Sequence, residues 1–254
     1  MKKGAPVSEV RRDGSGVALV TGAGRGIGFE VSRQLAQRGM TVVLTARDLE
    51  KAENAAEQLA GEGLETRARV LDVADDESVR ELASALEKEF GTIDVLVNNA
   101  AAYADWTEMA STADLTVAQA VFDTNLFGAW RVTQAFLPLI RQSPRGRIVI
   151  VSSGAGSHGE PQFGLTANGG AAATYGISKA ALNALTSKLA AELEGTTSVL
   201  INAVDPGLTA TYPGAEAMGA RPLPEGAASV VWAATLPDDG PAGGFFRDGE
   251  PLPW

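Results

Sequence analysis

The chain has 254 residues, 45% of them hydrophobic, and a formal net charge of −10. A nucleic-acid or anionic-membrane surface would repel so acidic a protein, so we expect neither kind of partner. The sequence contains no cysteine and one histidine, which excludes disulfides, a cysteine nucleophile and a zinc site built from such ligands.

The composition favours one domain in the cytoplasm. No apolar stretch approaches the ~18 residues of a membrane-spanning helix, and the N-terminal residues lack the apolar run of a signal peptide. The length suits one large α/β domain or two small ones. Because there is no internal linker, repeat or low-complexity segment, we expect a single domain.

Short apolar runs alternate with helical patterns along the chain, after a polar tail over residues 1–16 that we expect to be flexible. Strands are predicted at 17–21, 41–46, 66–71, 93–98, 147–151, 198–204 and 243–246. Helices are predicted at 26–38, 48–60, 75–90, 115–140 and 175–193. Apolar strands separated by helices imply a parallel sheet covered on both faces. We therefore predict one doubly wound α/β (Rossmann) domain over residues 17–254, with seven parallel strands.

A glycine-rich turn, T-G-A-G-R-G-I-G at residues 21–28, joins the first strand to the first helix. Gly22, Gly26 and Gly28 allow a tight turn, a close approach of the backbone to a pyrophosphate, and close helix packing. Amides at the helix start, such as that of Ile27, point toward an anion. Such a segment can be only a turn, but its position favours a dinucleotide site.

Tyr175 and Lys179 lie four residues apart in the run T-Y-G-I-S-K, which places both side chains on one face of a helix. A fixed neighbouring cation favours the charged form of a phenol and lowers its pKa. The pair therefore indicates a tyrosine that exchanges protons with an oxygen atom of a substrate.

The spacing of the glycine turn resembles that of the short-chain dehydrogenase/reductase family, and further elements of the family pattern follow in the right order. Four residues are similar to its active-site residues, namely Asn125, Ser153, Tyr175 and Lys179. Other positions match elements that contact the cofactor, namely Asp72, Val73, Asn98, Ala100, Pro206, Gly207, Thr209 and Thr211.

The resemblance implies a role for each of the four active-site residues. Tyr175 would donate a proton and Ser153 would hold the substrate oxygen. Lys179 would lower the pKa of the phenol and hold the nicotinamide ribose, and Asn125 would fix a water that relays protons. Ser152 is the alternative to Ser153. Asp72 could instead cap a helix, and Asn125 could bond only to backbone.

The charge at the end of the second strand bears on the cofactor. Arg47 ends the run L-T-A-R-D and Arg25 lies inside the glycine turn. Two guanidinium groups suit the extra phosphate of NADPH/NADP+, whereas an acidic residue would favour NADH. Asp48 leaves an alternative open, because it could pair with Arg47 or contact a ribose. We expect NADPH.

The sequence departs from the family pattern at two places. Ala101 replaces a glycine after Asn98-Asn99-Ala100, and an insertion separates Ser153 from Tyr175 by 22 residues. The insertion is expected to project over the site, and a longer one in similar carbonyl reductases covers a helix face used for dimerisation. Both a monomer and a homodimer remain open.

Reduction of a ketone or aldehyde by NADPH is the reaction that this pattern predicts. The aromatic residues of the irregular segments favour an apolar or aromatic carbonyl substrate over a phosphorylated one; they are Tyr103, Trp106, Phe163 and Tyr212. His158 has no spaced carboxylate partner, so we expect it to contact the loop or the substrate. A tailoring enzyme for dehydration, epimerisation or cyclisation, and a non-catalytic NADPH sensor, are the alternatives.

Overall fold

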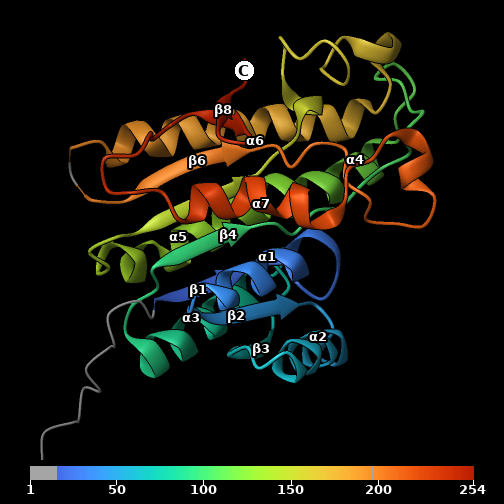
Figure 1. The fold of residues 1–254 in the computed structure, drawn as a ribbon. Helices are drawn as coiled ribbons and strands as arrows, with labels where there is room; N and C mark the ends of the chain where they lie inside the picture. The colour runs from blue at the N-terminus through green and yellow to red at the C-terminus, as the bar shows by residue number, and fades with distance from the viewer. Residues whose placement is uncertain (1–15, 196) are drawn as a thin grey trace, which may run out of the picture.

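The computed structural model describes residues 16–195 and 197–254 (Figure 1). Apart from Gly16, the tail predicted over residues 1–16 lies outside these ranges. The described residues form a central sheet with helices on both of its faces, as the sequence pattern predicts.

The sheet has eight strands among the described residues, in the order β3-β2-β1-β4-β5-β6-β7-β8. Their bounds are β1 Val17–Val20, β2 Thr41–Ala46, β3 Thr66–Val70, β4 Val95–Asn98, β5 Arg147–Val151, β6 Leu200–Val204, β7 Phe245–Arg247 and β8 Glu250–Pro251. The first seven strands pair in parallel, which confirms the predicted sheet. β8 pairs antiparallel with β7 and is an eighth strand that the pattern did not indicate, because its two residues include no apolar run.

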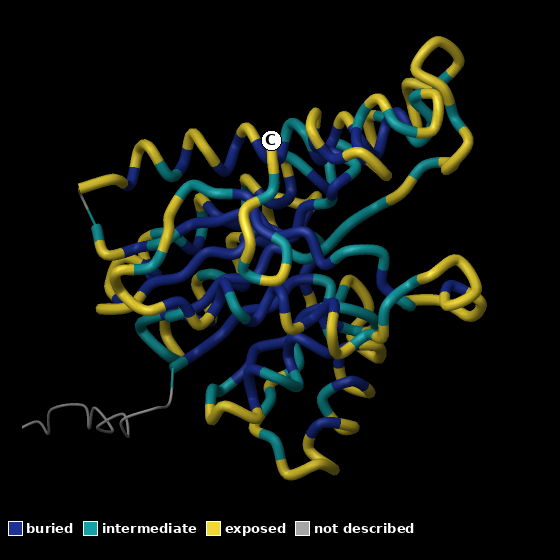
Figure 2. Tube along the Cα trace, turned by 45° about the horizontal axis from the view of Figure 1, so that its top comes forward, coloured by how far each residue is buried: buried dark blue, intermediate teal, exposed yellow. Residues whose placement is uncertain are grey.

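The helices are α1 Gly26–Gln37, α2 Leu49–Gly61, α3 Asp76–Phe90, α4 Leu115–Phe122, α5 Ala129–Arg141, α6 Ala173–Leu193 and α7 Leu223–Ala234. One core layer joins the sheet to α1, α2 and α7, and the other joins it to α3, α5 and α6. Figure 2 shows that the buried chain lies in the strands and on the inner helix faces, and that the outer faces and loops are exposed.

The strand order reverses direction between β1 and β4. All parallel strands end at the same edge, so the turn after β1 and the segments after β4, β5 and β6 meet there. Such a switch point is where doubly wound sheets bind their ligands. The fold therefore places the glycine turn and both irregular segments at one edge of the sheet.

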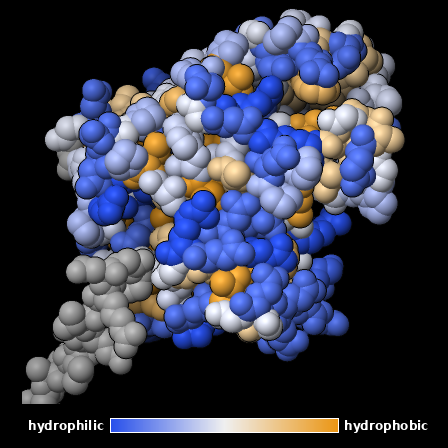
Figure 3. All heavy atoms as spheres, viewed as in Figure 1, coloured by the Kyte–Doolittle hydropathy of each residue, from blue (hydrophilic) through white to orange (hydrophobic). Residues whose placement is uncertain are grey.

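The surface facing the viewer in Figure 3 is mostly hydrophilic, with hydrophobic atoms in small separate areas. Large exposed apolar side chains include Phe127, Trp130 and Ile177, which lie in the segments 115–140 and 175–193 that would pair across a two-fold axis in a homodimer. The oligomeric state stays a prediction. Within the described ranges, no helix has both the length and the apolar composition that a membrane crossing needs.

Candidate active site

Ser153, Tyr175 and Lys179 come together beyond the end of β5. Ser153 follows the strand by two residues, and α6 presents Tyr175 and Lys179 toward it. The Ser153 side chain shares a hydrogen bond with the Tyr175 phenol. The Lys179 ammonium lies 5.6 Å from the centre of the Tyr175 ring. The arrangement brings two hydroxyl groups and a cation into one site.

Lys179 is almost fully buried, at 2% exposure. Its Nζ donates a hydrogen bond of 2.8 Å to the carbonyl oxygen of Val151, the last residue of β5. Burial lowers the pKa of Lys179 from 10.5 to about 8, and the negative charge of Asp205 opposes that shift. The side chain therefore remains mainly charged at neutral pH, in a site that disfavours charge.

Tyr175 is buried as well, and this corrects one expectation. Burial raises the pKa of the Tyr175 phenol well above 10, the neighbouring Tyr103 phenol and the negative charge of Asp205 add to the rise, and the Ser153 hydrogen bond opposes it. We expected Lys179 to lower this pKa. The desolvation of a buried phenolate outweighs any such effect, so the phenol is held in its protonated form.

The two adjacent serines have different surroundings. Ser152 is buried, and its hydroxyl donates a 2.5 Å hydrogen bond to Asn183 Oδ1 on α6. Ser153 is partly exposed and accepts a hydrogen bond from the Ala155 amide. Of the two, it is Ser153 whose side chain contacts the Tyr175 phenol. This geometry favours Ser153 as the group that holds a substrate oxygen.

Asn125 lies in a π-helical segment, Asp123–Gly128, between α4 and α5, where a continuous helix was predicted. Its amide bonds to both the N–H and the C=O of Ala102, and its Nδ2 also donates to Ser178 Oγ on α6. π-helical turns often occur at functional sites. The Asn125 side chain thus fastens the loop after β4 to the helix that carries Tyr175, and the water relay stays a prediction.

Two aromatic rings cover the Tyr175 phenol. The Tyr103 ring stacks on Tyr175 at 5.0 Å between ring centres, and Trp106 meets it edge-on at 5.1 Å. Both residues are 56% exposed, so the rings form an aromatic wall open to solvent on its other side. Tyr212 instead donates a hydrogen bond to Met218 Sδ. Of the four aromatic residues expected at the pocket, Tyr103 and Trp106 contact Tyr175.

The glycine turn fits the phosphates of a dinucleotide. Gly22 and Gly26 have φ of 64° and 61°, which disfavour any side chain. A Cβ on Gly22 would lie 2.8 Å from Ala100 Cα, and one on Gly28 would lie 2.4 Å from Asn99 Nδ2. No side chain caps the start of α1, so its first amides remain available to an anion.

Arg25 and Arg47 are both exposed, and among the described residues neither guanidinium makes an ion pair or hydrogen bond. Asp48 caps α2 by accepting a hydrogen bond from the Glu50 amide, and it pairs with Lys51 at 3.5 Å. The alternative pairing of Asp48 with Arg47 is thus not seen. Two unpaired cations at the edge of the glycine turn suit a phosphate.

Two of the residues expected to contact the cofactor lie at strand ends, Asp72 after β3 and Asn98 at the end of β4. Asp72 accepts a hydrogen bond from the Ala74 amide, while Asp75 caps α3. Asn98 donates to Thr133 Oγ1, and its buried Oδ1 has no partner among the described residues. These side chains are bonded within the protein, and contact with a cofactor stays a prediction for both.

The Pro206–Gly207 turn closes the opposite side of the site. Gly207 has φ of 70°, and the Thr209 hydroxyl donates to the carbonyl oxygens of both Pro206 and Gly207. The Thr211 side chain faces Gly26. A Cβ on that glycine would lie 3.8 Å from Thr211 Cγ2. The structure therefore brings this turn to the glycine turn, as the predicted cofactor site requires.

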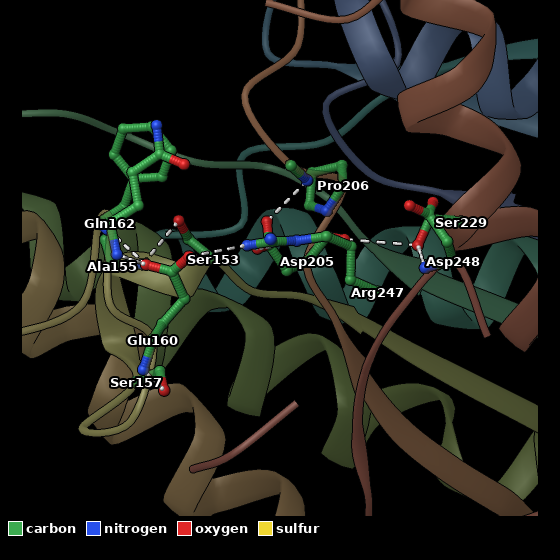
Figure 4. A network of polar contacts seen from close by, with 12 residues as sticks. Ser153, Ala155, Ser157, Glu160, Gln162, Asp205, Pro206, Ser229, Arg247 and Asp248 are labelled. Carbon is green, nitrogen blue, oxygen red and sulfur yellow. Dashed lines mark hydrogen bonds and ion pairs between the residues drawn. The ribbon is translucent and has the colours of Figure 1, made fainter. Parts of the chain in front are cut away.

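Four charged residues at the site were not identified from the sequence. Two buried carboxylates, Asp205 and Glu160, and the partly exposed Arg247 form a network beside Ser153 (Figure 4). Glu108 accepts a hydrogen bond from the Thr174 amide and so caps α6, whose own N-cap side chain makes none. Only Asp205 carries a local signal, because it directly precedes Pro206-Gly207.

Comparison with known proteins agrees with this geometry. A family model described as short chain dehydrogenase matches residues 16–218. Carbonyl reductase (NADPH) 1 of Sus scrofa is 36% identical over 280 residues, covering 94% of each chain. The chain belongs to the short-chain dehydrogenase family.

Two solved structures are similar as well. Salutaridine reductase from Papaver somniferum superimposes with a TM-score of 0.75 at 29% identity, covering 92% of this chain and 99% of the other. An alcohol dehydrogenase from Thermococcus sibiricus, complexed with 5-hydroxy-NADP, gives a TM-score of 0.78 at 28% identity, covering 92% and 95%.

Proposed function

We propose that this protein reduces the carbonyl group of an apolar or aromatic ketone or aldehyde with NADPH, and that Tyr175 donates the proton. The observation that carries the proposal is the Tyr175 phenol, buried under Tyr103 and Trp106 and bonded to Ser153. Similarity to a carbonyl reductase (NADPH) supports the reaction, and the fold and glycine turn support the cofactor.

Arg25 and Arg47 would hold the extra phosphate that distinguishes NADPH from NADH. Both are exposed beside the glycine turn, and neither is engaged by a carboxylate among the described residues. An arginine suits this role because its planar group binds phosphate through two parallel hydrogen bonds. When bound, NADPH supplies the hydride for the reduction.

Ser153 and Tyr175 bind and protonate the carbonyl oxygen of the substrate. Ser153 hydrogen-bonds the substrate oxygen as negative charge develops there, and Tyr175 transfers its proton to the same atom. Because burial keeps the phenol protonated, the proton is present at neutral pH. Lys179, charged below pH 8, then stabilises the phenolate that remains. Asn125 holds the loop that places Tyr103 and Trp106 over the site.

The aromatic wall indicates the substrate class. Tyr103 and Trp106 present ring surface next to the reacting phenol, and flat apolar groups pack well on such surfaces. Burial raises the pKa of Tyr103, and Arg25 is the one described cation whose charge opposes that rise. We assign Arg25 to the cofactor phosphate, so it would not bind a phosphate of the substrate. We therefore expect ketones with an aryl or alkyl group to be reduced in preference to phosphorylated ones.

The test is NADPH consumption with a panel of aryl, alkyl and phosphorylated carbonyl compounds, with the alcohol product quantified. Tyr175→Phe should abolish reduction and leave NADPH affinity within about twofold, because only a proton donor is lost. Tyr212→Phe is the matched control, since that phenol bonds to Met218 instead. Turnover by the Tyr175 variant above about a tenth of normal, or NADPH oxidation without alcohol, would contradict the proposal.

A further inference from the structure

The insertion between Ser153 and Tyr175 contains one buried charged side chain, that of Glu160. Most of residues 158–170 are exposed, but the Glu160 side chain is only 6% exposed. Its Oε2 accepts hydrogen bonds from the amides of Gln162 and Phe163, so the carboxylate organises the turn that follows it. A buried carboxylate that bonds only to neutral amides needs a cation nearby.

Arg247, at the end of β7, supplies that cation and faces a second carboxylate. Its Nη2 lies 3.7 Å from Glu160 Oε1, and its Nε and Nη2 donate to Asp205 Oδ2 at 3.0 and 2.5 Å. The Asp205 side chain is 4% exposed. Figure 4 shows the guanidinium between these two acids, which come from distant parts of the chain.

The Asp205 carboxylate also contacts the Pro206–Gly207 turn, on the side of the site expected to bind the cofactor. Asp205 Oδ1 accepts a 2.8 Å hydrogen bond from the Gly207 amide, within the Pro206–Gly207 turn. The network also lies directly behind Ser153, because a Cβ on Gly154 would be 3.0 Å from Arg247 Nη2 and 3.1 Å from Asp205 Oδ2. One guanidinium therefore connects the insertion, the turn after β6 and the backbone next to Ser153.

The C-terminal residues hold the same insertion from another side. The Ser157 hydroxyl donates to the carbonyl oxygen of Pro253, and the His158 amide donates to that of Trp254. These bonds fix the first residues of the insertion, ahead of Glu160. Residues 160–163 are held by the ion pair with Arg247 and by hydrogen bonds within the insertion, from the Glu160 amide to Ser157 Oγ and from Asn168 Nδ2 to the Gln162 carbonyl.

We propose that Arg247 is a positioning residue that fixes the insertion and the Pro206–Gly207 turn relative to each other on either side of Ser153. The inference rests on the proposed function, since these two segments flank the sites expected for the carbonyl substrate and NADPH. Replacing Arg247 by a neutral residue leaves two buried carboxylates without the guanidinium that lies between them, so both segments must move or take up water or protons.

Amide hydrogen exchange tests this positioning role without any assay of activity. In Arg247→Met, the amides of Phe163 and Gly207 should exchange at least about tenfold faster, because each bonds to a carboxylate that has lost its cation. Arg145→Met is the matched control, because it removes a guanidinium from an exposed pair with Asp238 ahead of β5. If the Phe163 and Gly207 amides keep their wild-type exchange rates, the proposal is wrong.

Kinetics separate positioning from a general loss of structure. Arg247→Met should raise the KM for both the carbonyl compound and NADPH, on the order of tenfold each, because misplacing a binding segment by ~1 Å weakens its contacts strongly. Glu160→Gln keeps the pair between Arg247 and Asp205, so it should raise only the carbonyl KM. Equal effects of the two variants on both KM values would contradict the assignment.

A double variant should change the exchange protection in the direction opposite to that caused by lost packing. Adding Glu160→Gln to Arg247→Met removes one of the two uncompensated carboxylates, so it should recover part of the lost exchange protection at Phe163. Further loss of protection would overturn the proposal. If Arg247→Met does not fold, Arg247→Lys serves instead, since one ammonium keeps the charge without contacting both acids. A wild-type protein that reduces no carbonyl compound would refute the proposed function, while the exchange data would still decide the role of Arg247.

Discussion

Lys179→Met should make the protein more stable at neutral pH while it removes activity. Lowering the pKa of Lys179 from 10.5 to about 8 means that the folded protein holds this ammonium at a cost of about 3 kcal/mol at pH 7. The methionine avoids that cost but loses the hydrogen bond to the Val151 carbonyl, which is worth about 1–2 kcal/mol. We expect a net gain of about 1–2 kcal/mol in the free energy of unfolding.

The pH dependence of this gain has a definite sign. Between pH 8 and 10.5 the unfolded chain keeps its proton on Lys179 while the folded protein has released it. The unfolded state thus binds more protons, and the stability of the wild type rises with pH through this window by up to ~1.4 kcal/mol per unit. The variant lacks this rise. The two stabilities should therefore become equal near pH ~9 and then reverse in order.

Urea unfolding followed by the fluorescence of the four tryptophans measures this at pH 7, 8, 9 and 9.5. The difference between the two proteins at each pH cancels the titration of the remaining groups. Lys188→Met, an exposed lysine on the same helix, is the control and should show no such crossing. A variant less stable than wild type at pH 7, or two parallel stability curves, would refute the reasoning.

Three further predictions concern rate, cofactor and helix capping. The kcat for reduction should fall as pH rises through about 8, because Lys179 loses the charge that stabilises the phenolate; a kcat that is flat up to pH 9.5 would contradict this. Arg47→Ala should weaken NADPH binding by about tenfold, measured by fluorescence titration, with NADH binding changed less than about twofold; equal losses for both cofactors would exclude a phosphate contact. Glu108→Ala should lower the free energy of unfolding by about 1 kcal/mol, because it removes the cap on the Thr174 amide. Glu57→Ala, on the exposed face of α2, is the control. Equal stability of the two variants would argue against the cap.

The sequence predicted the sheet well because each strand carries its own evidence. Buried parallel strands are mostly apolar, as in Val17–Val20 and in the last four residues of Arg147–Val151, and most of them are followed by a helix with a clear pattern. α7 was not found, because it begins with Leu-Pro-Glu-Gly directly after a long irregular segment that suggested a loop. The π-helical segment around Asn125 was not found either, since the apolar pattern of residues 115–140 continues through it.

Predicted site residues that lie close in sequence or follow a strand end come together in the structure. Tyr175 and Lys179 share a helix face, and Ser153 follows β5, so local spacing was enough to group them. The pairing of Glu160, Asp205 and Arg247 depends on three segments that only the folded sheet brings together. The rise in the pKa of Tyr175 was missed for the same reason, because burial by Tyr103 and Trp106 is a tertiary property.

The opposite pKa shifts of Tyr175 and Lys179 have one cause and suit one step of the reaction. Burial disfavours both the phenolate and the ammonium, so before proton transfer the site holds a neutral phenol beside a costly cation. In the proposed reaction, that cation faces a phenolate after the transfer, and the two charges compensate each other in a poorly solvated site where their attraction is strong. The site is thus more complementary to the charges that form during the reaction than to those of the resting protein, which is what catalysis requires. We expect the wild type to be less stable than Lys179→Met because it holds the Lys179 cation in a poorly solvated site before the phenolate forms.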